Sequence, residues 1–240
     1  MLGPTYAEHA RAAGIAGHKV EEVSRFDELH DADLAIVVNP NNPDGRVIER
    51  ERLLELAASL RGKGGLLVVD EAFMDVGPRE QSIAGDVGQG GMVVLRSFGK
   101  FFGLAGVRLG FALACETIAS RLAAQLGPWA VAGPALEYGV RALGDTGWQD
   151  AMRARLGVEA ARLDGLLDFH GARVSGGTSL FRYIDFDRAG SLFSALGERG
   201  ILLRHFADRR NVLRIGLPGS EEEWHRLESA LAAWSEVEKA

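Results

Sequence analysis

The 240-residue sequence has one cysteine, Cys115, which excludes an intrachain disulfide and a cysteine-based metal framework. No apolar run approaches the roughly 20 residues of a membrane-spanning helix, and the start lacks the regions of a signal peptide. There is no basic stripe, and the net charge of −6 gives no reason to expect nucleic-acid or anionic-lipid binding. We therefore expect a cytoplasmic protein with a small-molecule partner, no nucleic acid and no membrane.

The residues that are present, 47% hydrophobic and 25% charged, form an ordinary globular composition whose pattern changes once, near residues 142–147. Before that point, aliphatic runs alternate with helical stretches at 49–61 and 116–126, which predicts a mostly parallel sheet covered on both faces. The runs lie at 34–38, 65–69, 92–98 and 108–114. We expect a large α/β domain over 1–144.

A second, smaller α+β domain is expected over 145–240, beginning with a long linking helix whose apolar positions include Trp148, Leu156 and Leu163. Strand-like runs follow at 179–186, 201–206 and 211–217, with a helix near 190–199. Ser220 and Glu223 form a capping box before an apolar stripe, which predicts a final helix. The stripe consists of Trp224, Leu227, Leu231 and Trp234.

Four polar segments follow strands or strand-like ends: GPTY (3–6), NPNNPDG (39–45), DEAF (70–73) and SFGK (97–100). Carboxyl ends of parallel strands meet at one edge of a sheet, so the four segments are expected to face a single ligand. GPTY has almost no strand before it. We therefore expect the sheet of the large domain to continue upstream of Met1.

Each segment also has a simpler interpretation when it is taken alone. Tyr6 is then a packing residue, and NPNNPDG is a polar turn. Asp70 is a helix cap, or it coordinates Mg²⁺ beside Glu71 as in a nucleoside triphosphatase with an acidic residue at a strand end. A nucleotide site of this kind also needs a phosphate-binding loop, and the chain has no G-x-x-x-x-G-K-[ST] motif.

The combination of segments is more specific than any one of them. Asn42 is followed by Asp70 after 28 residues, by Lys100 after 30 more and by Arg108 after another eight. This series resembles the active site of fold type I pyridoxal phosphate enzymes, the aspartate aminotransferase superfamily. The resemblance covers essentially the whole chain. It implies a large, mostly parallel sheet domain, a smaller C-terminal α+β domain, pyridoxal 5'-phosphate as cofactor and a homodimer.

The resemblance also implies residue roles. Lys100 corresponds to the lysine that bonds to the cofactor, and Asp70 to the partner of its pyridinium nitrogen. Asn42 corresponds to the donor to the ring O3′, and Tyr6 to the aromatic residue stacked on the ring. Ser97 and Arg108 correspond to residues that hold the phosphate. A lysine must lose its proton before it attacks an aldehyde, which desolvation and neighbouring cations promote.

The segments NPNNPDGR, DEAFMDV and LRSFGKFFGLAGVRLGF resemble those of histidinol-phosphate aminotransferases and, within that subgroup, of threonine-phosphate decarboxylases of cobalamin biosynthesis. Phe73 departs from the aminotransferase pattern, because it stands where those enzymes have a tyrosine near O3′. The reaction implied is the conversion of L-threonine O-3-phosphate to (R)-1-aminopropan-2-ol O-2-phosphate and CO₂. Histidinol-phosphate aminotransferase, or a shortened inactive form of either enzyme, is the alternative.

Substrate binding is expected from the C-terminal part of the chain. Arg214, in NVLRIGL, corresponds to the arginine that grips the substrate α-carboxylate in this family. Arg204, His205 and Arg209, in LLRHFADRR, are candidates for the substrate phosphate. An arginine-rich loop is also an ordinary solvated surface, so this second assignment has a simple alternative. No metal is expected.

Overall fold

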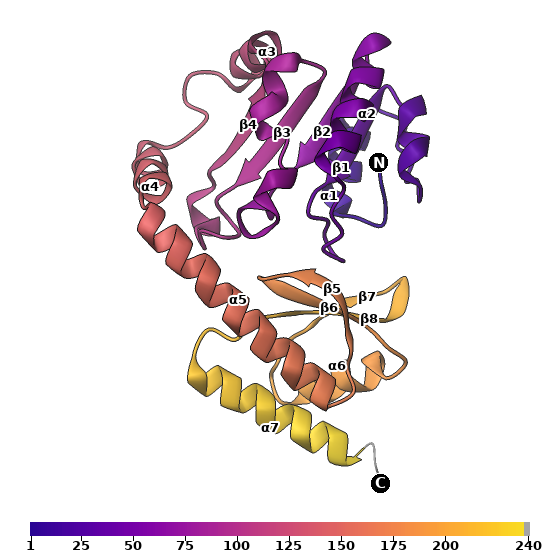
Figure 1. The fold of residues 1–240 in the computed structure, drawn as a ribbon, viewed down its shortest axis with the longest axis vertical. Helices are drawn as coiled ribbons and strands as arrows, with labels where there is room; N and C mark the ends of the chain where they lie inside the picture. Colours follow the sequence, from indigo (N-terminus) through magenta and orange to yellow (C-terminus); the bar gives the residue numbers. More distant parts are fainter. Residues whose placement is uncertain (238–240) are drawn as a thin grey trace. The chain divides into compact units, whose positions relative to one another are not determined.

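The computed structural model describes residues 1–237 and divides the chain into two compact units, Met1–Thr146 and Gly147–Ala240 (Figure 1). Each unit contains its own sheet and its own cluster of buried apolar side chains. The protein thus has the α/β fold with a second, smaller unit that the sequence predicts.

The sheet of the first unit has the order β1-β2-β3-β4. β1, β2 and β3 run parallel, and β4 runs antiparallel to β3 at the edge (Figure 1). The four runs that the sequence predicts as strands are confirmed, with small shifts at the ends. The strands are β1 (Leu34–Val38), β2 (Leu66–Asp70), β3 (Met92–Ser97) and β4 (Gly110–Ala114).

Four α-helices accompany this sheet among the described residues. The two that the sequence predicts, α2 (Arg50–Gly62) and α3 (Glu116–Leu126), are confirmed. Two others, α1 (Ala7–Ile15) and α4 (Gly133–Gly144), are not predicted from the sequence. Short 3₁₀ segments occupy several connections: Phe26–Asp31, Met74–Val76, Arg79–Gln81, Ala84–Gln89 and Ala105–Val107.

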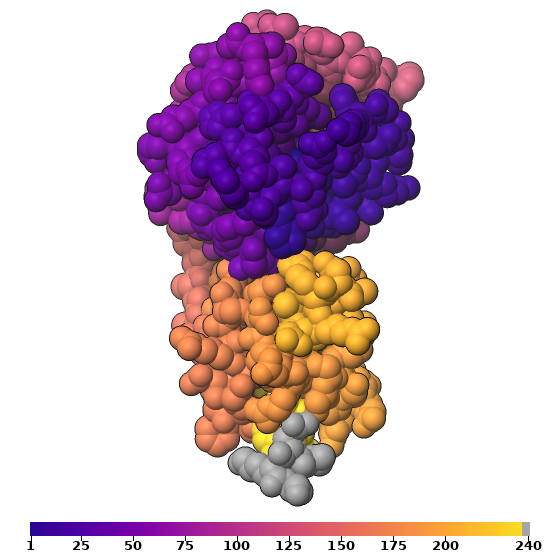
Figure 2. All heavy atoms as spheres, turned by 90° about the vertical axis from the view of Figure 1, so that its right-hand side faces the viewer, coloured from indigo at the N-terminus to yellow at the C-terminus, as the bar shows by residue number. Residues whose placement is uncertain are grey.

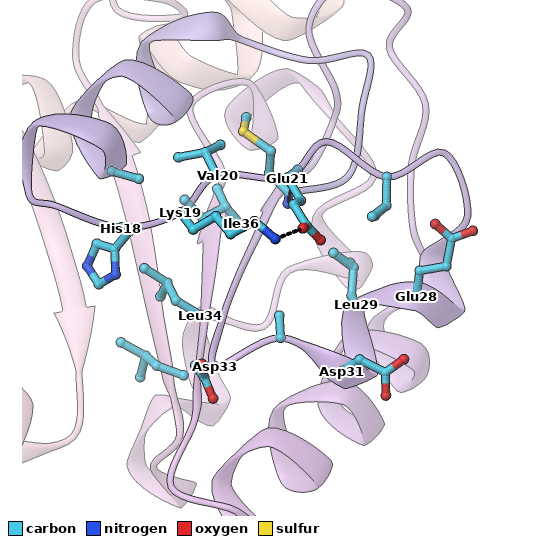
Figure 3. Close-up of a pocket in the computed structure, with 15 residues that line it drawn as sticks. His18, Lys19, Val20, Glu21, Glu28, Leu29, Asp31, Asp33, Leu34 and Ile36 are labelled. Atoms are coloured by element: carbon cyan, nitrogen blue, oxygen red, sulfur yellow. Dashed lines mark hydrogen bonds and ion pairs between the residues drawn. The ribbon is translucent and has the colours of Figure 1, made fainter.

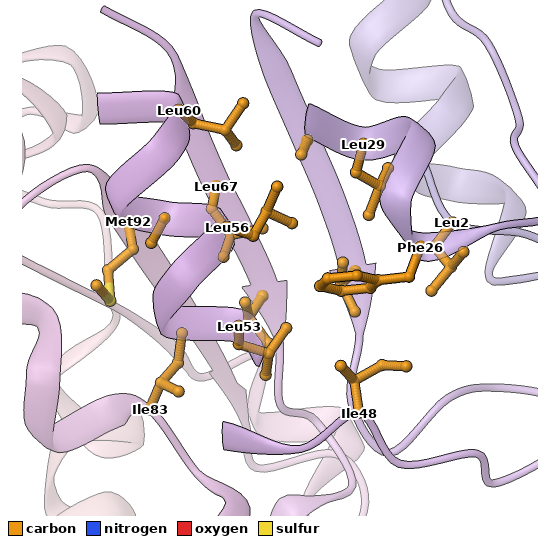
Figure 4. Packing of buried hydrophobic residues seen from close by; sticks show 14 of the residues in the cluster. Leu2, Phe26, Leu29, Ile48, Leu53, Leu56, Leu60, Leu67, Ile83 and Met92 are labelled. Carbon is orange, nitrogen blue, oxygen red and sulfur yellow. The ribbon is translucent and has the colours of Figure 1, made fainter. Parts of the chain in front are cut away.

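The core of the first unit lies between α2 and the parallel strands (Figure 4). Leu53, Leu56 and Leu60 fall on one face of α2 because helix positions three and four apart are neighbours, and all three are fully buried. Burying a leucine side chain contributes about 1.5–3 kcal/mol, so this face fixes α2 on the sheet. The strands and their carboxyl ends are therefore held on a rigid support.

The second unit packs helices on one face of an antiparallel sheet with the order β5-β6-β8-β7 (Figure 1). Ile184 and Leu213, on adjacent strands, point into the helix-facing core. The elements are α5 (Thr146–Phe169), β5 (Val174–Thr178), β6 (Phe181–Asp185), α6 (Ala189–Glu198), β7 (Arg204–Phe206), β8 (Arg209–Gly216) and α7 (Glu221–Val237). Among the described residues, no helix combines the length and apolarity needed to cross a membrane.

The start of α7 confirms the predicted cap. The Ser220 hydroxyl accepts a hydrogen bond from the Glu223 backbone N–H at 3.3 Å. The Glu223 carboxylate reaches back to the Gly219 N–H at 2.6 Å, one residue before the position expected for a capping box. The predicted stripe of Trp224, Leu227, Leu231 and Trp234 is buried. The helix therefore begins and packs as its sequence indicates.

Candidate active site

The carboxyl ends of β1, β2 and β3 lie at one edge of the first sheet, where Val38 pairs with Asp70 and Asp70 pairs with Leu95. The segments NPNNPDG, DEAF and SFGK leave the sheet at this edge. The GPTY segment lies alongside β1, because the Leu2 N–H donates to the Ile36 carbonyl at 3.0 Å. All four segments that the sequence singles out thus belong to one region of the first unit.

Asp70 ends β2 with both carboxylate oxygens engaged. Oδ1 accepts the backbone N–H of Ala72 at 2.9 Å, and Oδ2 lies 2.7 Å from Nε2 of His9. The side chains of His9 and Asp70 are 16% and 13% exposed, so the pair is largely shielded from water. His9 is not predicted from the sequence as a site residue. His9 comes three residues after Tyr6, and this spacing could have predicted that the two side chains share one face of a helix.

Glu71 follows β2 directly and has other partners than Asp70, in keeping with the alternation of side chains along an extended chain. Its fully buried carboxylate accepts bonds from the Ser82 hydroxyl at 2.6 Å and the Ile83 N–H at 2.9 Å. It also pairs with Nη1 of Arg96 at 3.0 Å. Asp70 and Glu71 therefore do not share a cation site. No group of three or more candidate metal ligands occurs in the part of the chain that the structure describes.

Asn41 joins the two loops that carry Tyr6 and Asn42. Its Oδ1 accepts from the Thr5 hydroxyl at 2.7 Å, and its Nδ2 donates to the Pro4 carbonyl at 3.0 Å. Asn42 follows directly and is half-buried. Tyr6 is 46% exposed, and its ring meets the His9 ring edge-on at a centroid distance of 5.6 Å.

Lys100 lies in a tight turn after β3. The Gly103 N–H donates to the Lys100 carbonyl at 3.0 Å, and Gly103 adopts a φ of 67°, which favours glycine. The Lys100 ammonium lies 5.5 Å from the centroid of the buried Phe73 ring. The sequence leads us to expect a desolvated Lys100. In the structure Lys100 is exposed, so the residues of this unit do not shield it from water.

The backbones at Ser97 and Arg108 are linked through their neighbours, because Ser97 lies opposite Gly110 and the Phe98 N–H donates to the Leu109 carbonyl at 3.2 Å. The Ser97 hydroxyl accepts the Gly99 N–H at 3.1 Å. Arg108 has a left-handed backbone with φ of 57°, which is uncommon for a residue with a side chain. Its guanidinium is exposed and donates to the Ala105 carbonyl at 3.4 Å.

The predicted substrate residues lie in the second unit, on the β7–β8 hairpin. Figure 2 shows this hairpin, in the yellow-orange part of the colour scale, at the surface of its unit. Arg204 lies directly opposite Arg214 and therefore on the same face of the sheet. Burial lowers the pKa of Arg214, and the neighbouring positive charge of Arg204 lowers that pKa further.

The other two candidates have different surroundings. His205 alternates to the opposite face of β7, where its ring lies 5.3 Å from that of Phe193. Arg209 donates to the Tyr183 hydroxyl at 3.4 Å, and its guanidinium lies 5.1 Å from the Phe206 ring. The structure therefore brings Arg204 and Arg214 together and places His205 apart from them.

A large hollow of the first unit, about 670 Å³, is not at this edge (Figure 3). It is lined by Leu34 and Leu66, the first residues of β1 and β2, and by the ion pair of Lys19 with Glu21. A smaller hollow of about 270 Å³ is lined by Ser97 together with Phe98, Phe102 and Phe111. The site is thus located by its chemistry rather than by cavity size.

The whole-chain comparison agrees with this geometry. Residues 1–231 match the model of the aminotransferase class I and II family. The chain belongs to this family. Its members use pyridoxal phosphate, and a member from Sinorhizobium meliloti, a histidinol-phosphate aminotransferase, was solved in complex with that cofactor. That structure has a TM-score of 0.84 at 21% identity, covering 97% of this chain and 68% of the other.

Two threonine-phosphate decarboxylases are similar to this chain over nearly its whole length. The protein from Pseudomonas aeruginosa is 46% identical over 98% of this chain and 72% of its own length. The protein from Sinorhizobium sp. is 46% identical over 97% of this chain and 69% of its own length. A histidinol-phosphate aminotransferase from Vibrio parahaemolyticus is less similar, at 29% identity over 91% of this chain and 67% of its own length.

Two further solved structures of the family show the same fold. The histidinol-phosphate aminotransferase from Clostridium acetobutylicum has a TM-score of 0.88 at 22% identity, covering 98% of this chain and 77% of the other. The L-threonine-O-3-phosphate decarboxylase from Porphyromonas gingivalis has a TM-score of 0.77 at 23% identity, covering 98% and 76%. The predicted fold type is confirmed.

The side chains at the strand ends fit the family cofactor in their chemistry. Pyridoxal phosphate presents a ring nitrogen, a phenolic oxygen, an aldehyde and a phosphate. The first unit offers a shielded carboxylate at Asp70, an amine at Lys100, and a hydroxyl and a guanidinium at Ser97 and Arg108. With the amide of Asn42 for the phenolic oxygen, each group of the cofactor has a partner of suitable chemistry at this edge of the sheet.

Proposed function

We propose that this protein is a pyridoxal phosphate-dependent threonine-phosphate decarboxylase. It converts L-threonine O-3-phosphate to (R)-1-aminopropan-2-ol O-2-phosphate and CO₂, with a proton replacing the carboxylate on Cα. The observation that carries the proposal is 46% identity to threonine-phosphate decarboxylases over nearly the whole chain. The gathered strand-end residues support it, because they include the carboxylate and the lysine that the cofactor requires.

The residues of the first unit, expected to be the cofactor domain, have separate tasks in this proposal. Lys100 supplies the amine that bonds to the cofactor, and Asp70 holds a proton on the ring nitrogen. Asn42 donates to the phenolic oxygen beside the buried ring of Phe73, and Tyr6 covers a face of the cofactor ring. Ser97 and Arg108 bind the phosphate. The bound cofactor supplies an electron-poor ring that accepts the electron pair of a breaking bond at the substrate Cα.

The second unit, expected to be the small domain, supplies cations for a substrate that carries a carboxylate and a phosphate. Arg204 and Arg214 face the same side of the sheet, and like charges directly opposite each other are unfavourable. A substrate whose two anionic groups lie over these arginines offsets that repulsion, which adds to burial in lowering the pKa of Arg214. In this proposal Arg214 holds the α-carboxylate, and Arg204 and Arg209 serve the phosphate. The position of His205 against Phe193 gives it the weakest support.

The proposal is tested by supplying the purified protein and pyridoxal phosphate with carboxyl-labelled L-threonine O-3-phosphate. We expect labelled CO₂ to be released, with little glutamate formed from 2-oxoglutarate. Efficient amino transfer from histidinol phosphate without CO₂ would favour the aminotransferase alternative and overturn the proposal.

A matched pair of lysine variants locates the chemistry. Lys100→Ala is expected to abolish CO₂ release, whereas Lys63→Ala changes a lysine that donates to the His30 carbonyl at the end of α2 and is expected to retain it. Borohydride reduction of the loaded wild-type protein is expected to label Lys100. Labelling of Lys19, Lys63 or Lys239 instead would contradict the site assignment.

We further propose that the protein is a homodimer. The support is the surface of α4, where Leu136 and Val140 are exposed four residues apart. The face of α4 turned to the sheet carries small residues, Ala135 and Gly139. A helix that turns its larger apolar side chains outward is typical of a surface that another molecule covers.

A further inference from the structure

His9 is a side chain of the proposed cofactor site that the sequence does not single out, and it contacts two of the site's members. Its Nε2 lies 2.7 Å from Oδ2 of Asp70. Its ring meets Tyr6 edge-on, with an interplanar angle of 85°. A single residue of α1 thus contacts both the proposed partner of the ring nitrogen and the aromatic side chain proposed to cover the ring.

The contact with Asp70 has a definite direction. An ionised carboxylate can only accept hydrogen bonds, so the proton lies on Nε2 of His9 and is donated to Oδ2. The Ala72 N–H already occupies Oδ1 at 2.9 Å. Two donors on two different oxygens fix the rotation of the carboxylate about its χ angles. Without His9, only one of the two oxygens is held by these contacts.

The position of His9 is itself fixed by the helix. The His9 N–H donates to the Tyr6 carbonyl at 3.3 Å in the first turn of α1. The imidazole is 16% exposed, so water weakens a hydrogen bond through it only slightly. Helix α1 has no buried residue. The His9–Asp70 bond is therefore a principal attachment of this helix to the strand end.

We propose that His9 is a positioning residue: it holds the Asp70 carboxylate and the Tyr6 ring in the arrangement that receives pyridoxal phosphate. This inference rests on the proposed function, because it takes the strand-end site to bind that cofactor. His9 acts through Asp70 and Tyr6 and takes no part in bond breaking at the substrate.

The first test compares cofactor affinity in variants that differ at position 9. His9→Phe keeps an aromatic ring beside Tyr6 and removes the donor to Asp70. Hydrogen bonds to charged groups are worth about 1.5–3 kcal/mol, so we expect the dissociation constant of pyridoxal phosphate to rise at least about tenfold. His9→Gln, which reaches Oδ2 with an amide N–H, is expected to restore most of the affinity. His18→Phe, the same change at an exposed histidine, is the control.

The second test is a double-mutant cycle. Cofactor affinity is measured for the wild type, His9→Phe, Asp70→Asn and the combined variant. If His9 acts through the Asp70 carboxylate, its loss costs much less in the Asp70→Asn background than in the wild type. With saturating cofactor, His9→Phe should lower kcat for L-threonine O-3-phosphate and leave KM within about twofold, because the proposed substrate cations are other residues.

The outcomes separate this inference from the proposed function. Tight cofactor binding by the wild type with equal affinity in His9→Phe, or equal losses in both backgrounds of the cycle, would overturn the role of His9. A folded wild type that does not bind the cofactor would instead overturn the proposed function. If His9→Phe does not fold, His9→Asn, whose amide is too short to reach Asp70, takes its place against His9→Gln.

Discussion

Asn41 and Asn42 are neighbouring side chains of one type in the loop after β1, and their environments differ. Asn41 is buried, and its amide bonds to Thr5, to Pro4 and to the Asp44 carboxylate at 2.7 Å. Asn42 is half-buried beside it. Asn41 therefore holds the loop of Tyr6 against the loop of Asn42, the residue proposed to donate to the cofactor.

Replacing Asn41 by alanine should destabilise the protein by about 1–3 kcal/mol, because the Pro4 carbonyl and the Thr5 hydroxyl lose a partner in a part-buried setting. Urea unfolding followed by circular dichroism measures the loss. Asn211→Ala, at an exposed asparagine of β8, is the control and should stay within about 0.5 kcal/mol of the wild type. Equal losses in the two variants would contradict the role of Asn41.

The place of several proposed site residues at one edge of the sheet could be predicted from the sequence, because each follows a recognisable strand. Asp70 and Lys100 come after aliphatic runs, and parallel strands bring their ends to one edge. His9 could not be found in the same way, because its partner Asp70 is 61 residues away. The different partners of Asp70 and Glu71 are consistent with side-chain alternation, because the Glu71 N–H still bonds to the Leu95 carbonyl just beyond the end of β2.

At the scale of elements, the outcome depends on whether an element presents an apolar stripe. The helix α7 does so, with Trp224 and Leu231 fully buried, and its sequence predicts it. Helix α1 has no buried residue and shows no apolar stripe. Helix α4 has apolar side chains at helical spacing, but its glycines lower the helix propensity of the segment. Strand β5 contains Gly176 and Gly177, and glycines are depleted in strands, so the sequence does not predict this strand.

The cap of α7 can be tested separately from its stripe. Ser220→Ala removes the acceptor of the Glu223 N–H and should cost about 1 kcal/mol of unfolding free energy in denaturant titrations. Ser220→Asp retains an acceptor next to the positive end of the helix dipole and should be close to the wild type. A loss in Ser220→Asp as large as in Ser220→Ala would show that the hydroxyl does not act as a cap.

On the scale of the whole molecule, the chain builds two separate cores, one around α2 and the parallel sheet and one around α5, α6 and α7. The change of periodicity in the sequence reflects this, because parallel buried strands and an antiparallel half-covered sheet have different apolar patterns. The order of strands within each sheet could not be predicted, since it depends on pairing between distant residues. The strand order comes from the structure, and family membership is consistent with the fold that contains it.

The exposed apolar side chains of the first unit lead to a specific prediction, that the protein is a homodimer in solution. Val140 is 71% exposed on α4, and Trp129, in the connection from α3 to α4, is 91% exposed. We expect sedimentation to give about twice the chain mass of 25.8 kDa. Val140→Glu combined with Trp129→Glu places charges on a surface that association would desolvate, and should shift the protein to monomers.

The matched control for this pair is Leu202→Glu combined with Phe169→Glu. These two residues are 87% and 83% exposed and lie in the second unit, outside the surface of α4. The control should keep the mass of the dimer, because a charge on a solvated surface costs little. A wild type that sediments as a monomer at tens of micromolar would contradict the dimer. Dissociation of the control as complete as that of the α4 variant would show that α4 is not the surface involved.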